Sequence, residues 1–222
     1  EAALEPQDDN GRPTAGKIGR ISQMEKTHER YNHMVFHEVG GSDHGLLSGM
    51  KVALDCANGA SSKTSPEILR ALGAEVSVSS DEPNGVNINE DCGCTHPEII
   101  AGLVKESGAR VGIAHDGDAD RIALCDENGI PLDGDELMAI VALHYLEAGK
   151  LVDNTLVATI MSNCGLDAAM EAAGGKLVRA GVGDRFVIQE MRKGGFNFGG
   201  EQSGDIVCGD YLMTGDGIIA GI

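Results

Sequence analysis

The chain has 222 residues, of which 41% are hydrophobic and 3% aromatic, and its formal net charge is −18. This length is sufficient for one or two domains with an aliphatic core. The negative charge disfavours binding to nucleic acids and to anionic membrane surfaces, because both are negatively charged themselves. No apolar run approaches the about 18 residues that a membrane-spanning helix needs. The polar stretch 1–13 lacks the features of a signal peptide.

Six cysteines are scattered along the chain: Cys56, Cys92, Cys94, Cys125, Cys164 and Cys208. Several of them lie within apolar runs, which is typical of buried free thiols in the reducing cytoplasm. Cys92, Cys94 and His96 could instead begin a zinc site, but no second ligand pair follows at zinc spacing. We therefore expect free thiols and a cytoplasmic protein.

Strand-like and helix-like segments alternate along the whole chain. Short apolar runs predict strands, and apolar residues recurring every three or four positions predict helices. The predicted strands are 51–55, 75–78, 110–114, 122–126, 156–161, 176–180 and 196–199. The predicted helices are 17–39, 65–73, 97–106, 135–148, 165–173, 184–193 and a last helix after residue 214. This order predicts an α/β fold, with two consecutive domains whose mixed, largely parallel sheets are flanked by helices.

Polar residues at segment starts predict where four helices begin. The predicted caps are Ser65 with Pro66 in the first turn, the capping box of Thr95 and Glu98, Asp184, and Thr214.

The domain boundary is expected at 149–154. It divides the chain into a polar segment 1–13, a first domain 14–150 and a second domain 151–222, whose apolar ending suggests truncation.

The strongest chemical signal is the segment 115–121, His-Asp-Gly-Asp-Ala-Asp-Arg. Asp116, Asp118 and Asp120 alternate with small residues, so a tight turn could direct three carboxylates at one cation. Oxygen ligands of this kind select Mg²⁺ or Ca²⁺ rather than Zn²⁺. Arg121 follows directly, where a phosphate group could bridge the cation and the guanidinium. A solvated acidic turn is the simpler alternative.

An EF-hand is the second alternative for this segment. Asp116, Asp118, Asp120 and Glu127 occupy the first, third, fifth and twelfth positions of such a loop. However, Arg121 stands where the EF-hand loop needs glycine for its sharp turn. The flanking segments also have the pattern of strands rather than helices, which disfavours this interpretation.

Together with other segments, these residues resemble the α-D-phosphohexomutase superfamily. Asp-Gly-Asp-Ala-Asp-Arg at 116–121 resembles its metal loop, and Gly-Glu-Gln-Ser-Gly at 200–204 resembles its sugar-binding loop. Gly-Asp-Arg at 183–185 and Thr-Gly-Asp-Gly at 214–217 also fit the family. The stretch 87–98 and the glutamine at 202 are similar to the phosphoglucosamine mutase group within it.

The resemblance implies a fold of four domains, of which this chain matches the second and third. The first would carry a phosphorylated serine and the fourth a phosphate-binding loop, and both would belong to the same polypeptide. The implied activity is a cytoplasmic isomerase of amino-sugar metabolism and cell-wall precursor synthesis. It would move phosphate between O6 and O1 of glucosamine through a phosphoserine and a bisphosphate intermediate.

The resemblance also implies roles for individual residues. Asp116, Asp118 and Asp120 would bind Mg²⁺, and Arg121 would contact the reacting phosphate. Residues of the sugar loop and its surroundings would bind the substrate. These are Gly200, Glu201 and Ser203, together with Arg185 and His96.

One position departs from the family pattern. The superfamily usually has histidine after Ser-Gly in the sugar loop, whereas this chain has Asp205. Histidine commonly transfers protons near neutral pH, but an ordinary aspartate is ionised there and only accepts hydrogen bonds. Asp205 is therefore a candidate catalytic residue. The sequence leaves open whether an aspartate at this position alters the activity or another group transfers the proton.

Three other functions are compatible with the pattern to different degrees. A phosphomannomutase/phosphoglucomutase is the nearest alternative enzyme. A cation-binding α/β fragment without catalysis is the second, because no serine loop precedes the aspartates; the isolated chain is therefore expected to be inactive. A nucleotide-binding Rossmann fold is the least compatible, since no Gly-x-Gly-x-x-Gly follows the first strand.

Overall fold

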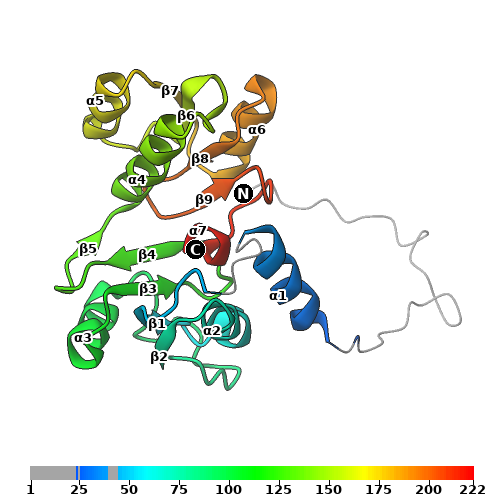
Figure 1. Cartoon of the computed structure of the whole chain (residues 1–222), viewed down its shortest axis with the longest axis vertical. Coiled ribbons are helices and arrows are strands. Elements are labelled where there is room, and N and C mark those ends of the chain that lie inside the picture. Colours follow the sequence, from blue (N-terminus) through cyan, green and yellow to red (C-terminus); the bar gives the residue numbers. More distant parts are fainter. Residues whose placement is uncertain (1–23, 25, 40–44) are drawn as a thin grey trace, which may run out of the picture.

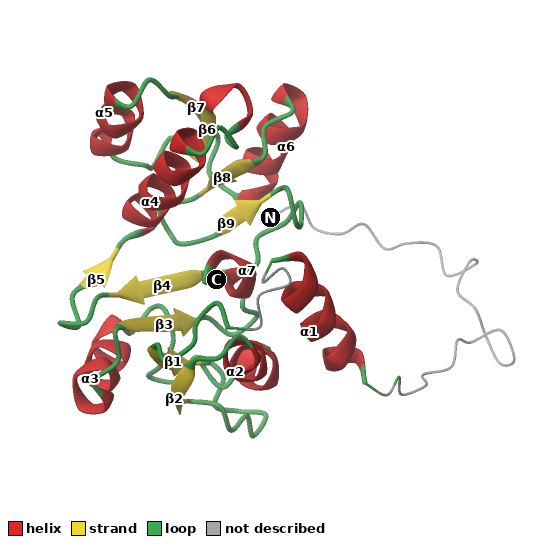
Figure 2. Ribbon diagram, in the orientation of Figure 1, coloured by secondary structure: helices red, strands yellow, loops and turns green. Residues whose placement is uncertain are grey.

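A computed structural model describes residues 24, 26–39 and 45–222. The polar segment 1–13 and residues 17–23 and 25 of the helix predicted over 17–39 lie outside the described residues. Met24 and Lys26 are described and are not helical, so this helix begins later than predicted, at Thr27. Figures 1 and 2 show two sheets, each with helices packed beside it, and the C-terminus close to the junction between them.

The first sheet has the strand order β2-β1-β3-β4-β5. Its strands are β1 (Lys51–Asp55), β2 (Glu75–Ser79), β3 (Val111–His115), β4 (Ile122–Cys125) and β5 (Pro131–Leu132). β1 is parallel to β2 and β3, whereas β4 is antiparallel to β3 and β5. A short loop between β3 and β4 requires this reversal, visible in Figure 2, because parallel neighbours need a long crossover. The helices in this part of the chain are α1 (Thr27–Glu38), α2 (Ser61–Ala71) and α3 (Pro97–Ser107).

The second sheet has the strand order β7-β6-β8-β9. Its strands are β6 (Thr155–Thr159), β7 (Lys176–Ala180), β8 (Phe198–Gly200) and β9 (Ile206–Cys208). Around it lie α4 (Gly134–Glu147), a 3-10 turn (Val152–Asn154), α5 (Cys164–Ala172), α6 (Asp184–Gly194) and α7 (Gly217–Ala220). β6 is parallel to β7 and β8, and β9 is antiparallel to β8. Both sheets are therefore mixed and flanked by helices, and the predicted fold class is confirmed.

The predicted helix starts were less accurate than the helices themselves. α2 begins at Ser61 rather than Ser65, so that Pro66 lies inside the helix. The reason is a tertiary contact: the N–H of Ala60 donates to the carbonyl of Gly117 at 2.8 Å, and the chain turns into the helix from there. The residue pattern of α2 alone cannot reveal this hydrogen bond.

The other three predicted caps were also wrong. The residue before α3 is His96, which makes no capping hydrogen bond through its side chain, so the Thr95 capping box is absent. Gly183, not Asp184, precedes α6. Asp216 rather than Thr214 caps α7, and its carboxylate accepts hydrogen bonds from the N–H groups of Ile218 and Ile219 at 3.0 Å.

One hydrophobic cluster is common to both sheets, and each sheet has a further cluster of its own. A single cluster of buried side chains includes Leu54 and Ile113 from the first sheet and Leu156, Phe198 and Ile206 from the second. α4, which follows β5 directly, packs against α5 and β8 as well as β4. Among the described residues, no helix is both long and apolar enough to cross a membrane.

All six cysteines are free thiols, as predicted. Cys56, Cys92, Cys125 and Cys208 are buried and Cys94 is half-buried, whereas Cys164 is exposed at the start of α5. The expectation that the thiols are buried therefore fails at Cys164. In the described part of the chain, Cys92, Cys94 and His96 form no cluster with metal-ligand geometry, so the zinc alternative has no support.

Candidate cation and sugar site

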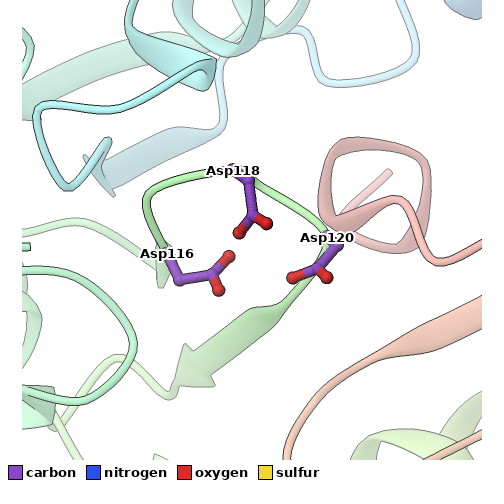
Figure 3. A group of neighbouring side chains, drawn as sticks. All are labelled: Asp116, Asp118 and Asp120. Atoms are coloured by element: carbon purple, nitrogen blue, oxygen red, sulfur yellow. The ribbon is translucent and has the colours of Figure 1, made fainter. Parts of the chain in front are cut away.

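The loop between β3 and β4, residues 116–121, is called the aspartate loop below. Asp116, Asp118 and Asp120 each direct a carboxylate oxygen inward, and these oxygens lie within 4.8 Å of one another. Figure 3 shows the three side chains facing each other across the turn. Ala119 takes a left-handed conformation with φ 62°, which closes the turn tightly enough for this convergence. Because strands flank the loop, the EF-hand interpretation is wrong.

The electrostatics of the aspartate loop suit a hard cation. Burial, followed by the nearby carboxylates of Asp116 and Asp118, raises the pKa of Asp120 to about 6. Its Oδ1 atom is buried and accepts no hydrogen bond in the described structure. A divalent cation would satisfy that oxygen and remove the repulsion between the carboxylates. The donor set, three carboxylates, fits Mg²⁺ chemically.

Arg121 is hydrogen-bonded to Asp116 within the aspartate loop. Its Nε donates to Oδ2 of Asp116 at 2.7 Å, a terminal guanidinium nitrogen lies 2.7 Å from the same oxygen, and its backbone N–H donates to Oδ1 at 3.2 Å. Asp116 is almost fully buried, with 3% of its surface exposed, whereas the Arg121 side chain keeps 38%. The guanidinium thus orients Asp116 while part of it stays open to an anionic ligand.

The turn between β8 and β9, residues 200–205, is called the glutamate loop below. Oε1 of Glu201 accepts a hydrogen bond from the N–H of Gly183 at 2.7 Å, which joins this loop to the turn before α6. The backbone closes on itself, since the N–H of Glu201 donates to the carbonyl of Asp205 at 2.8 Å. Ser203 is exposed at the tip and free to meet a ligand.

The two loops are joined through their backbones. Arg121 and Asp205 form an isolated antiparallel bridge, and the N–H of Ile122 donates to the carbonyl of Gly204 at 3.0 Å. A Cβ atom at Gly204 would collide with the carbonyl oxygen of Ile122, so only glycine allows this approach. The N–H of Gly134 adds a contact to the carbonyl of Gln202 at 3.2 Å. Residues about 80 positions apart in the chain are therefore in direct backbone contact.

Asp205 lies at this junction and is only 6% exposed. Burial is the first cause of its raised pKa, about 7, and the negative charges of Asp120, Asp184 and Glu201 add to it. Its Oδ1 accepts no hydrogen bond in the described structure, and it lies so close to Gly215 that a side chain there would collide with it. Asp205 is thus unlike an ordinary surface aspartate, because its carboxyl group stays protonated to a higher pH.

The two remaining candidate residues lie less centrally. Arg185 is exposed at the start of α6, and its guanidinium carbon lies 4.4 Å from the centre of the Phe186 ring. His96 contacts its own helix, with Nδ1 3.1 Å from Oε1 of Glu98. Their roles in ligand binding remain predictions.

Several supporting residues escaped the sequence patterns. Gly59 and Gly134 pack so closely against the two loops that neither has room for a Cβ atom. His115 is fully buried, with Nε2 3.0 Å from Oγ of Ser65, and burial lowers its pKa to about 4. The hydroxyl of Tyr31 in α1 donates to both carboxylate oxygens of Asp216, at 2.9 and 2.8 Å. The Asn-Gly-Ala sequence at 58–60 is a weak signal for Gly59, and His115 lies within the segment 115–121, whereas the sequence carries no signal for the contacts of Gly134 and Tyr31.

Two family models match the chain. The model described as phosphoglucomutase/phosphomannomutase, alpha/beta/alpha domain II matches residues 29–129, and the corresponding domain III model matches residues 133–222. The phosphoglucosamine mutase of Geobacter sp. (strain M21) is 50% identical over 96% of this chain and 47% of its own length. That of Kocuria rhizophila is 48% identical over 95% and 46%. The chain therefore spans about half the length of these relatives.

Solved structures show the same fold. A phosphoglucomutase/phosphomannomutase family protein from Burkholderia thailandensis superposes with a TM-score of 0.76 at 23% identity, over 87% of this chain and 42% of that one. Aspergillus fumigatus N-acetylphosphoglucosamine mutase, solved in complex with GlcNAc-6P and magnesium, gives 0.70 at 19% identity, over 89% and 46%. At these identities the likeness concerns the fold alone.

Proposed function

Because the chain belongs to the phosphoglucomutase/phosphomannomutase family and carries its domains II and III, we propose that it forms the cation-binding and sugar-binding half of a phosphohexomutase. The proposed reaction of the longer protein is the interconversion of glucosamine 6-phosphate and glucosamine 1-phosphate. Relatives at 50% and 49% identity that are named phosphoglucosamine mutase favour this substrate over mannose or glucose phosphates.

The main observation behind this proposal is the direct junction of the two loops. The carboxylates of the aspartate loop converge within 4.8 Å, and the strand that leaves this loop is hydrogen-bonded to the glutamate loop. A phosphosugar has a charged group and a hydroxyl-bearing ring. A cation site and a hydroxyl-binding loop held at a constant separation suit such a molecule.

The proposed roles of the residues follow from their chemistry. Asp116, Asp118 and Asp120 would hold Mg²⁺, which when bound would neutralise negative charge on a phosphoryl group. Arg121 would donate charge-assisted hydrogen bonds to the same phosphate from its exposed face. On the sugar side, Glu201 and Ser203 would bind ring hydroxyls, and Gly200 would shape the loop. Arg185 would bind phosphate or sugar, His96 would bind the substrate, and Asp205 would transfer a proton.

The phosphoryl transfer itself would need groups from the rest of the longer protein. A phosphoserine outside this chain would give its phosphoryl group to a free hydroxyl of the hexose monophosphate, forming a hexose bisphosphate. After the sugar reorients, the other phosphoryl group would return to the serine oxygen, leaving the isomeric monophosphate. The present chain would contribute charge neutralisation and orientation, which account for most of the catalysis of such transfers.

A mutase assay on the longer protein tests this proposal. We expect turnover of glucosamine 6-phosphate to exceed that of glucose 1-phosphate and mannose 1-phosphate, and Glu201→Gln to lower turnover of all three. Preference for mannose or glucose phosphate would instead make the protein a phosphomannomutase/phosphoglucomutase. The isolated chain, which contains no phosphorylatable serine loop of the family type, is expected to show cation binding without turnover.

A further inference from the structure

The segment that follows β1 lies directly against the aspartate loop. The N–H of Ala60 donates to the carbonyl of Gly117, between the first two aspartates, at 2.8 Å. The loop before α3 makes a second hydrogen bond to this region: the N–H of Cys94 donates to the carbonyl of His115 at 2.9 Å. The backbone is thus held on both sides of Asp116 by segments distant in the sequence.

The contact at Gly59 is closer than any side chain would permit. A Cβ atom there would collide with the carbonyl oxygen of Gly117 and lie 2.8 Å from its carbonyl carbon and its Cα. On its other side, Gly117 has no room either, because a Cβ would lie 2.7 Å from Nδ2 of Asn89 and from the Ile88 side chain. Gly117 therefore lies between two segments, and on the Gly59 side it meets backbone, which cannot rotate away as a side chain can.

Asp55 is hydrogen-bonded to both of these supporting segments. It is fully buried at the end of β1, and its two carboxylate oxygens accept hydrogen bonds from the N–H groups of Ala57 and Gly93, both at 2.9 Å. Ala57 and Asn58 both take left-handed conformations, with φ 52° and 48°. Non-glycine residues adopt this conformation only when the surroundings hold them there, and such strain is typical of functional sites.

We propose that Gly59 and Asp55 are positioning residues for the cation site, which act through the backbone of Gly117 and His115. This inference rests on the proposed cation-binding function of the aspartate loop. Gly59 limits how far Gly117 can move outward, and so sets the spacing between Asp116 and Asp118. Asp55 holds Gly93 and, through the adjacent Cys94, the carbonyl that precedes Asp116. Neither residue touches the cation itself.

Titration of the full chain with Mn²⁺ alone, followed by electron paramagnetic resonance, tests this proposal. Mn²⁺ takes the oxygen ligands that Mg²⁺ takes, and its free and bound forms are distinguishable. We expect Gly59→Ala to weaken Mn²⁺ binding by at least about 10-fold, the loss typical of residues that orient metal ligands. Asp55→Asn, which keeps the side-chain size but replaces one acceptor oxygen by a donor, should weaken it by about 10-fold as well.

Gly108→Ala is the matched control. Gly108 ends α3 with φ 64°, and a Cβ there would meet no atom within 4 Å. Alanine at this position strains the backbone without any collision. Its Mn²⁺ affinity should equal that of the wild type. A general loss of stability would lower Mn²⁺ affinity in all three variants, whereas a positioning role lowers it only in Gly59→Ala and Asp55→Asn.

The outcomes separate this proposal from the one on which it rests. If Asp118→Asn binds Mn²⁺ as tightly as the wild type, the proposed cation site itself is wrong. If Asp118→Asn loses binding while Asp55→Asn, folded by circular dichroism, retains wild-type affinity, the positioning role is overturned and the cation site stands. Should Gly59→Ala fail to fold, Asp55→Asn decides the question, because it introduces no added atom into the contact with Gly117.

Discussion

The aspartate loop and the glutamate loop differ in the source of the contacts that shape their functional side chains. In the aspartate loop, Asp116 is oriented by Arg121, five residues away. In the glutamate loop, Glu201 is oriented by Gly183, 18 residues away, and the backbone rests on Ile122. A short stretch of sequence therefore carries the side-chain contacts of the first loop, although distant segments hold its backbone, whereas the side-chain contact of Glu201 in the second loop itself comes from a distant segment.

Removal of one carboxylate from the aspartate loop should have the largest effect. We expect Asp118→Asn to weaken divalent-cation binding by about 100-fold, since a hard cation loses one of three anionic ligands. Glu127→Gln is the control, because Glu127 would be a ligand only in an EF-hand. Isothermal titration with Mg²⁺ measures both variants. Equal losses in the two would contradict the site described here.

A methyl group at position 204, where the two loops are in contact, should disrupt the conformation of the glutamate loop. Gly204 has φ 93° and lies against the carbonyl of Ile122, whereas Gly195 has φ 70° and no atom within 4 Å of a Cβ. We expect Gly204→Ala to lower the free energy of unfolding by about 2–4 kcal/mol, which combines backbone strain and collision. Gly195→Ala should cost about 1 kcal/mol through strain alone. Urea denaturation compares them, and equal losses would show that the contact between the loops contributes nothing.

The buried Asp205 gives the junction a dependence on pH. Its folded pKa of about 7 lies above the ordinary value near 3.8, so its contribution to stability is complete at low pH and is lost as pH rises through about 7. Asp120, Asp184, Glu201 and Arg121 are the charged groups that act on it. We expect Asp205→Asn to be more stable than the wild type by about 1–2 kcal/mol at pH about 8, and the gain to vanish near pH 4.

Urea denaturation at a series of pH values, without added cation, measures this difference. Glu127→Gln serves again as the control, because Glu127 is exposed and outside both loops. A stability gain for Asp205→Asn that is the same at every pH would show that ionisation of Asp205 plays no part.

The smallest expected effect concerns turnover by the longer protein that we propose to be a phosphohexomutase. If Asp205 transfers a proton, Asp205→His should shift one limb of the pH–rate profile, because the two side chains ordinarily titrate about 2.5 units apart. Burial of Asp205 brings its pKa close to that of histidine, so the shift should be smaller than this difference. Superimposable profiles would assign Asp205 to loop structure alone.

The same contrast explains what could be predicted from the sequence. The alternating carboxylates of the aspartate loop are adjacent in the chain, and the strands around them carry strong apolar patterns. The burial of Asp205 and the support from Gly134 could not be predicted, because both arise where segments about 70 to 80 residues apart meet. The start of α2 was missed for the same reason, since the contact of Ala60 with Gly117 decides it.

The domain boundary predicted at 149–154 remains a prediction. The contacts of α4 with α5 and β8, and the family-model limits at 129 and 133, favour an earlier position. We therefore propose that the change of domain occurs between β5 and α4. The physical difficulty is that α4 is long, apolar and close in sequence to the first sheet, so its pattern alone does not reveal which sheet it covers.

The hydrophobic cluster common to both sheets has a consequence for how the chain unfolds. Leu54 and Ile113 lie in the same cluster as Phe198 and Ile206, so separation of the two family domains would expose apolar surface on each. We therefore expect that neither half has an independent melting transition. Calorimetry should give one cooperative peak whose van't Hoff and measured enthalpies agree, and a peptide cut between β5 and α4 should yield fragments that stay associated until both unfold.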